Sequence, residues 1–173
     1  MSKIKLLISG SPGCGKTTLI KEFIAETKLR ASGFYTQEIR GARREGFKLI
    51  TLDGREGVLA HIGIDYGPKV GRYGVNLRDL NSIGVDSLEK ALGRADLLVV
   101  DEIGKMELLS PQFREAVVKC LDSPKPLLGT IYGGAHPFVQ MVRSRPEVEI
   151  LRMKRGKRWE ILEYLRGRFP PKG

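Results

Sequence analysis

The chain alternates between short apolar runs and longer stretches in which apolar residues recur at every third or fourth position. A continuous apolar run of about four to eight residues is typical of a strand buried on both faces, and the longer spacing is typical of a helix with one buried face. By these criteria we expect strands at 3–9, 96–101, 126–132 and 148–153, and helices at 16–28, 85–92, 110–121, 137–145 and 159–169. Strands that alternate with helices favour a parallel sheet covered by helices on both faces.

One region departs from this alternation. The segments 33–40, 46–52 and 57–62 all look extended, and the separators 41–45 and 53–56 carry residues that favour turns. This pattern predicts a small antiparallel β insertion, followed by a glycine-rich surface loop at 63–74. The fold class is therefore α/β with a mostly parallel sheet, and we expect residues 1–173 to form a single domain.

A phosphate-binding pattern lies between the first strand and the first helix. It reads Gly-x-x-x-x-Gly-Lys-Thr and consists of Gly10, Ser11, Pro12, Gly13, Cys14, Gly15, Lys16 and Thr17. Glycines permit the backbone to approach a ligand closely, and the amide groups of such a loop converge on a phosphate at the positive end of the next helix. The pattern predicts a P-loop that binds a nucleoside triphosphate. Lys16 would contact the β- and γ-phosphates, and the Thr17 hydroxyl would bind Mg²⁺.

A second motif ends the strand expected at 96–101. Four apolar residues precede two acids, Asp101 and Glu102. A carboxylate at the carboxyl end of a buried parallel strand lies at the edge where ligands of such sheets bind. We therefore assign Asp101 to the metal ion together with Thr17, and Glu102 to catalysis, as the base that orients and deprotonates the attacking water.

Composition and charge bear on the cellular compartment and on possible partners of the protein. The net charge is +10, and no apolar run approaches the roughly 20 residues of a membrane span. Two cysteines without a Cys/His cluster fit a reducing compartment, and we expect the protein to be cytoplasmic. We also expect a monomer. The basic segments 40–44 and 152–158 could bind nucleic acid, or they could be solvated surface on a protein that binds polyanionic nucleotides. We favour the second interpretation because no RNA-binding aromatic motif accompanies them.

Four segments together carry a resemblance to a known family. They are the loop 10–18, the run Gly-Phe-Tyr-Thr-Gln-Glu at 33–38, the run Val-Asp-Glu-Ile-Gly-Lys-Met-Glu-Leu at 100–108, and Leu-Gly-Thr-Ile at 128–131. In this order they resemble the small nucleoside-triphosphatase family of thermophilic archaea and bacteria, which also includes the human cancer-related nucleoside triphosphatase. The turn 132–136 departs from the family pattern, which places a proline and a lysine there, and this puts a lysine contact at that turn in doubt.

The resemblance implies a RecA-like P-loop fold and Mg²⁺-dependent hydrolysis of ATP, GTP and other nucleoside triphosphates, with broad base tolerance. It also implies that a second segment lies across the nucleotide, with Glu102 as base and Lys16 as its catalytic partner. That segment comprises Asp101, Glu102, Ile103, Gly104, Lys105, Met106, Glu107 and Leu108.

Two other classes of function stay open, a small-molecule or nucleotide kinase and an RNA- or DNA-associated NTPase. Several single residues also have two interpretations. Thr130 could sense the γ-phosphate or be structural, and Trp159 could stack on a base or belong to the core. We expect His61 and His136 to be surface or loop residues.

Overall fold

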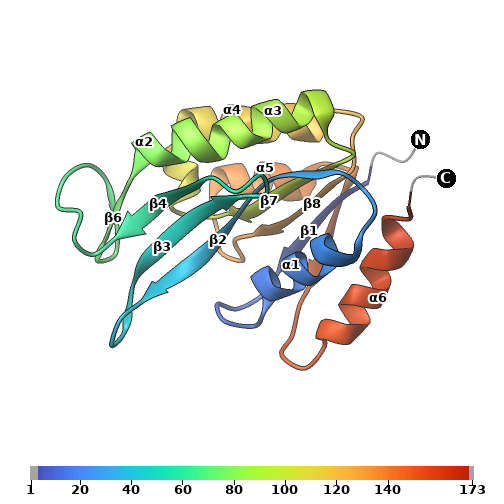
Figure 1. The fold of residues 1–173 in the computed structure, drawn as a ribbon, viewed down its shortest axis with the longest axis horizontal. Coiled ribbons are helices and arrows are strands. Elements are labelled where there is room, and N and C mark those ends of the chain that lie inside the picture. Colours follow the sequence, from blue (N-terminus) through green and yellow to red (C-terminus); the bar gives the residue numbers. More distant parts are fainter. Residues whose placement is uncertain (1–3, 172–173) are drawn as a thin grey trace.

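The computed structural model describes residues 4–171. One nine-stranded sheet runs through them in the order β5-β6-β4-β3-β2-β7-β8-β1-β9 (Figure 1). The strands are β1 (Lys5–Ser9), β2 (Ala31–Arg40), β3 (Arg44–Thr51), β4 (Glu56–His61), β5 (Lys69–Val70), β6 (Tyr73–Val75), β7 (Leu97–Ile103), β8 (Leu127–Ile131) and β9 (Val148–Arg152). The α-helices are α1 (Lys16–Glu26), α2 (Leu77–Asp79), α3 (Asp86–Arg94), α4 (Pro111–Asp122), α5 (Pro137–Ser144) and α6 (Arg158–Arg168).

The parallel part of the sheet contains the strands that flank the phosphate loop. β8 and β9 pair in parallel with β1 on either side, and β7 pairs in parallel with β8 and with the first half of β2. Alternate residues of β1 face opposite cores. Leu6 and Ile8 pack with α1 and α6, whereas Leu7 packs with α3, α4 and α5. Figure 1 shows α3 and α4 on one face of the sheet and α1 and α6 on the other. The predicted α/β class is confirmed, and residue 3, where the first strand was expected to begin, lies outside the described residues.

The antiparallel insertion is also confirmed. β2, β3 and β4 pair antiparallel, and the second half of β2 continues past β7 as a hairpin with β3 (Figure 1). The surface loop expected at 63–74 is wrong in part, because β5 and β6 form a short hairpin there that pairs with β4. These strands have only two and three residues, and a run that short leaves no alternation of apolar and polar positions to recognise.

The helix expected at 85–92 is longer at its start. α2 begins at Leu77, a π-helical turn η1 (Leu80–Val85) follows, and α3 completes the helical segment. The side chain of Asn76 accepts a hydrogen bond from the Asp79 backbone N–H at 3.0 Å and caps the start. Gly84 weakens the helical signal in the sequence, but it lies buried against Phe34 and Leu49, so packing decides the conformation here.

Polar groups fix both ends of α4. Ser110 accepts a hydrogen bond from the Phe113 backbone N–H at 3.0 Å, which confirms the predicted N-cap before Pro111. At the other end, the buried ammonium group of Lys5 donates to the carbonyl oxygens of Cys120 at 3.1 Å, Ser123 at 2.7 Å and Lys125. Lys5 thereby ties the first strand to the end of this helix, where carbonyl groups lack partners within the helix.

Candidate nucleotide-binding site

The phosphate loop joins β1 to α1 at the carboxyl edge of the parallel strands. Gly13 and Gly15 have φ angles of 78° and 97°, in the left-handed region that residues with a Cβ rarely adopt. α1 begins at Lys16 without a side-chain cap, so the backbone N–H groups of its first turn lack intrahelical partners. Such N–H groups at the positive end of a helix form an anion-binding site.

Three side-chain contacts organise the charged groups around this loop. The Lys16 Nζ donates to the Gly10 carbonyl oxygen at 2.7 Å. The Thr17 hydroxyl donates to Asp101 Oδ2 at 2.7 Å, and the Thr130 hydroxyl donates to Asp101 Oδ1 at 2.6 Å. The phosphate loop and the acidic end of β7 are thus in direct contact through Thr17 and Asp101, which are 84 residues apart in the sequence. Thr130 is fully buried, and its hydroxyl contacts the carboxylate oxygen that Thr17 does not contact.

Asp101 and Thr17 are a suitable pair of ligands for Mg²⁺. Both supply hard oxygen donors, and the ion typically takes one or two protein carboxylates and completes its shell with phosphate oxygens and water. Burial raises the pKa of Asp101, whereas hydrogen bonds from Thr130, Thr17 and the Thr36 backbone, and the charge of Lys16, lower it. Burial is the largest of these effects, so the pKa of Asp101 is raised overall, and the hydrogen bonds and the nearby ammonium offset part of that rise.

Two further carboxyl groups lie next to Asp101. The Glu102 backbone N–H donates to Glu107 Oε2 at 3.3 Å. A Cβ built on Gly104 would lie 3.0 Å from Glu107 Oε1 and 3.2 Å from Glu102 Oε2, so both carboxyl groups border this glycine. Burial, and secondarily the Glu102 charge, raise the pKa of Glu107 well above its ordinary value. Burial also raises the pKa of Glu102, Lys16 lowers it and Asp101 raises it further.

Only some residues of the segment 101–108, which was expected to lie across the nucleotide, line the cleft. Part of it lines the same cleft as the phosphate loop, namely Glu102, Gly104, Lys105, Met106 and Glu107. Ile103 and Leu108 are not at the cleft, because β7 and the turn after it point their side chains into the hydrophobic core. Cys14 likewise packs against the second core instead of lining this cleft.

The cleft is larger than the predicted residues alone would define. Its volume is about 1330 Å³, and side chains that were not among the predicted site residues also line it, among them Lys21, Thr36, Gln37, Arg44, Arg143 and Arg152. Thr36 and Gln37 belong to the run 33–38 that carried the family resemblance, and Arg152 ends β9 next to β1. These positions were within reach of sequence reasoning. Arg143 was not, because α5 brings it there and it donates to the Tyr132 carbonyl oxygen at 3.1 Å.

The remaining single-residue expectations have mixed outcomes. Lys105 is exposed and lies 5.2 Å from the centre of the Tyr132 ring. His61 accepts a hydrogen bond from the Gly63 N–H at 2.9 Å, and His136 caps α5 by accepting one from the Phe138 N–H at 3.1 Å. Both histidines thus serve local structure. The interpretation of Trp159 as a core residue is wrong, since its side chain is 64% exposed.

A parallel sheet with a P-loop, a threonine hydroxyl and an acidic strand end at one edge defines the class of P-loop nucleotide-binding proteins. Comparison with known proteins narrows the class. A family model described as NTPase matches residues 5–165, and the chain belongs to this family.

Individual relatives agree with this assignment. Nucleoside-triphosphatase THEP1 of Thermotoga maritima is 50% identical over 160 residues, which cover 92% of this chain and 91% of the relative. The crystal structure of THEP1 from the hyperthermophile Aquifex aeolicus superposes with a TM-score of 0.87 at 34% identity, over 94% of this chain and 96% of that one. The solution structure of a human cancer-related nucleoside triphosphatase has a TM-score of 0.78, also at 34% identity, over 94% and 95% of the two chains. Within residues 4–171, no helix has the length and apolarity to span a membrane.

Proposed function

We propose that this chain hydrolyses nucleoside triphosphates to the diphosphate and phosphate, with Mg²⁺ as cofactor and Glu102 as the general base. Membership of the NTPase family supports the class of reaction. The observation that carries the proposed mechanism is the 2.7 Å hydrogen bond between Thr17 and the buried Asp101, beside a cleft that Thr17, Lys16 and Glu102 line.

In this proposal the phosphate loop binds and orients the triphosphate. The free N–H groups at the start of α1 hold the β-phosphate. The Lys16 ammonium group donates to the Gly10 carbonyl oxygen at 2.7 Å. With a nucleotide bound, it would donate to the β- and γ-phosphates. Mg²⁺ bound by Thr17 and Asp101 would offset the negative charge that builds up on the phosphate oxygens.

We assign to Glu102 the role of orienting and deprotonating the attacking water. Its carboxyl group lies one residue beyond the proposed metal ligand and lines the same cleft. Burial raises its pKa above the ordinary value of a glutamate, which suits a base that accepts a proton during the reaction. Lys16 lowers that pKa and so favours the ionised carboxylate that can take the proton.

We also propose that the whole chain acts as one domain, in the cytoplasm. One sheet passes through all nine described strands, and a hydrophobic core lies on each of its faces. Within residues 4–171 all nine strands belong to this one sheet, and the motifs from both halves of the sequence meet beside one cleft.

The test is the Glu102→Gln variant, which keeps the size of the side chain and removes the base. We expect phosphate release from ATP with Mg²⁺ to fall by about 100-fold or more, because a positioned base typically contributes about 10²- to 10⁴-fold, while nucleotide affinity stays within about twofold. The matched control is Glu89→Gln on α3, where Glu89 contacts Lys119 at 3.1 Å away from the cleft. Undiminished hydrolysis by Glu102→Gln would remove the assignment. Nucleotide consumption that requires an added phosphate acceptor would instead identify a kinase.

A further inference from the structure

A second cavity lies beside the phosphate loop. Its volume is about 630 Å³, within the range of about 300–1,000 Å³ that is usual for sites of small organic ligands. The loop residue Gly15 and the helix residue Thr18 line both this cavity and the main cleft. The two spaces therefore adjoin the same part of the chain, the start of α1. The second cavity is open to solvent, and Met153, Arg158 and Trp159, which lie in and around the connection from β9 to α6, also line it.

The order of the strands in the sheet indicates which way a bound triphosphate would run across the phosphate loop. The proposed metal ligand Asp101 and base Glu102 end β7, and the order β7-β8-β1-β9 puts them on one side of the phosphate loop. The γ-phosphate must lie at that end. The α-phosphate and the nucleoside therefore leave the loop on its opposite side, towards β9 and the residues that follow it. Thr18, which directly follows Thr17, is exposed at this exit.

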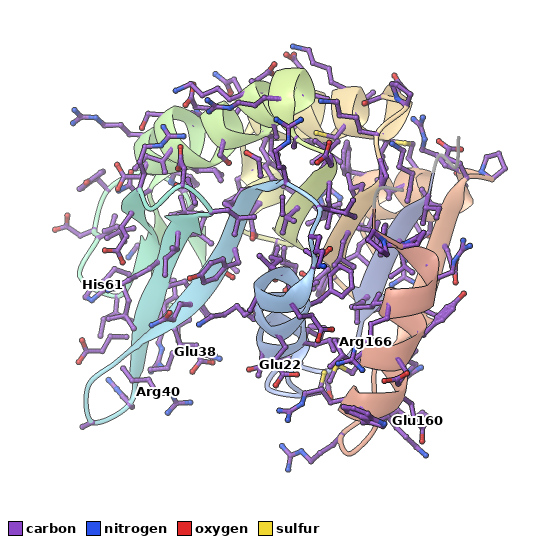
Figure 2. All side chains as sticks on the ribbon, turned by 45° about the vertical axis from the view of Figure 1, so that its right-hand side comes forward. Glu22, Glu38, Arg40, His61, Glu160 and Arg166 are labelled. Carbon is purple, nitrogen blue, oxygen red and sulfur yellow. The ribbon has the colours of Figure 1, made fainter. Side chains whose placement is uncertain are left out.

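Trp159 has the properties of a stacking surface in this cavity. It is the one tryptophan of the chain, and it is 64% exposed although a large indole is usually buried. Arg166 lies 5.1 Å from its ring centre. Arg166 in turn holds Glu26 of α1 through two hydrogen bonds of 2.7 and 2.8 Å (Figure 2 shows Arg166 between α1 and α6). The indole is thus supported from one side by a residue that is itself anchored.

We propose that this second cavity binds the nucleoside part of the substrate, with the base stacked on Trp159. The inference rests on the proposed function, since it takes the orientation of the triphosphate from the assigned roles of Asp101 and Glu102. Every nucleobase has a π-face, so stacking on an aromatic ring binds all of them without reading their edges. Stacking on Trp159 would therefore allow one site to accept different bases. Met153, an adaptable and almost fully buried side chain, forms part of the wall.

Because Trp159 is the single tryptophan, its fluorescence reports directly on the cavity. We would titrate the wild-type protein, with Mg²⁺, with ADP, GDP, CDP and UDP, and separately with inorganic pyrophosphate. Diphosphates and pyrophosphate share the phosphate groups, and only the former carry a nucleoside. We expect each nucleoside diphosphate to quench the fluorescence, most strongly for the purines, and pyrophosphate to leave it unchanged.

Calorimetry then measures affinity without relying on the fluorophore. Trp159→Ala should weaken the binding of all four diphosphates by about 5- to 140-fold, the loss that stacking on one aromatic ring corresponds to, and leave pyrophosphate binding unchanged. Trp159→Phe should recover most of the affinity. Tyr66→Ala removes a comparably exposed aromatic side chain, 68% exposed and outside both cavities, and should match the wild type.

The proposal is overturned by equal diphosphate affinities of Trp159→Ala and wild type, or by pyrophosphate quenching equal to that of the nucleotides. Neither measurement depends on turnover. A protein that binds diphosphates through Trp159 but releases no phosphate from triphosphates would instead refute the proposed hydrolysis and leave the nucleoside site standing.

Discussion

The role of Thr130 can be tested by removing one hydroxyl group. Thr130→Val keeps the shape of a side chain that is fully buried in β8 and deletes the donor to Asp101 Oδ1 at 2.6 Å. Asp101 keeps the Thr17 hydroxyl on its other oxygen. If Thr130 orients the proposed metal ligand, its loss should weaken both the fold and the metal site. If Thr130 only fills space in the strand, valine should replace it with little effect.

The expected loss of stability follows from the burial of Thr130 and Asp101. Asp101 is 2% exposed, so water cannot replace the lost hydrogen bond. A hydrogen bond to a charged group is worth about 1.5–3 kcal/mol. For a domain of this size a loss of 1 kcal/mol lowers the melting temperature by about 2–4 °C, so we expect a decrease of roughly 3–12 °C. Loss of a group that holds a metal ligand typically costs about 10- to 100-fold in metal affinity, and the Mg²⁺ concentration for half-maximal hydrolysis should rise accordingly.

Thermal unfolding and a Mg²⁺ titration of phosphate release measure both effects. Thr130→Ser keeps the hydroxyl group and should recover most of the Mg²⁺ response. Thr51→Val is the matched control, because Thr51 is also buried but donates to Asp53, a half-exposed acid in the turn after β3. We expect that variant to need no additional Mg²⁺. A Thr130→Val protein that melts within about 1 °C of wild type and has an unchanged Mg²⁺ requirement would refute the reasoning.

Two further variants test buried polar groups. Glu107 has a pKa raised by burial above the ordinary 4.5, so the folded state binds its proton more tightly than the unfolded state and the contribution to stability falls as pH rises above about 4.5. Glu107→Gln should therefore have a melting temperature that depends less on pH above 4.5 than that of wild type, and a parallel pH profile would contradict this. Lys5→Met leaves three carbonyl oxygens at the end of α4 without this donor. Burying methionine costs less than burying an ammonium group, which offsets part of this loss. The free energy of unfolding in urea should therefore fall by roughly 2–4 kcal/mol. An unchanged urea midpoint would show that the ammonium group adds nothing to stability.

The elements that sequence reasoning located well are those whose signal is local. The phosphate loop, the N-cap at Ser110 and the apolar run of β7 each need only neighbouring residues to be recognised. The order of strands is a different matter. Nothing in the sequence of β8 says that it separates β1 from β7, and this separation is what allows Thr130 to reach Asp101.

The errors arose where packing outweighs local pattern. The helical segment before Asp86 contains Gly84, which the sequence presents as a weak point and which the fold buries beside Phe34 and Leu49. Ile103 and Leu108 were grouped with Glu102 because they share a motif, yet alternation along β7 and the turn after it sends their side chains into the core. A motif thus marks a segment, while the direction of each side chain decides which members can touch a ligand.

The basic segment 152–158 changes meaning when the structure is considered. From composition it was a possible contact for nucleic acid, with a net charge of +10 in support. In the fold, Arg152 lines the main cleft, and Arg155 and Arg158 line the second cavity. Positive charge at these positions would attract a triphosphate, because a cleft of one sign concentrates ligands of the other. The same connection carries Trp159, so under our two proposals this segment would supply both charge and an aromatic surface to a single nucleotide, in line with the interpretation favoured from the sequence.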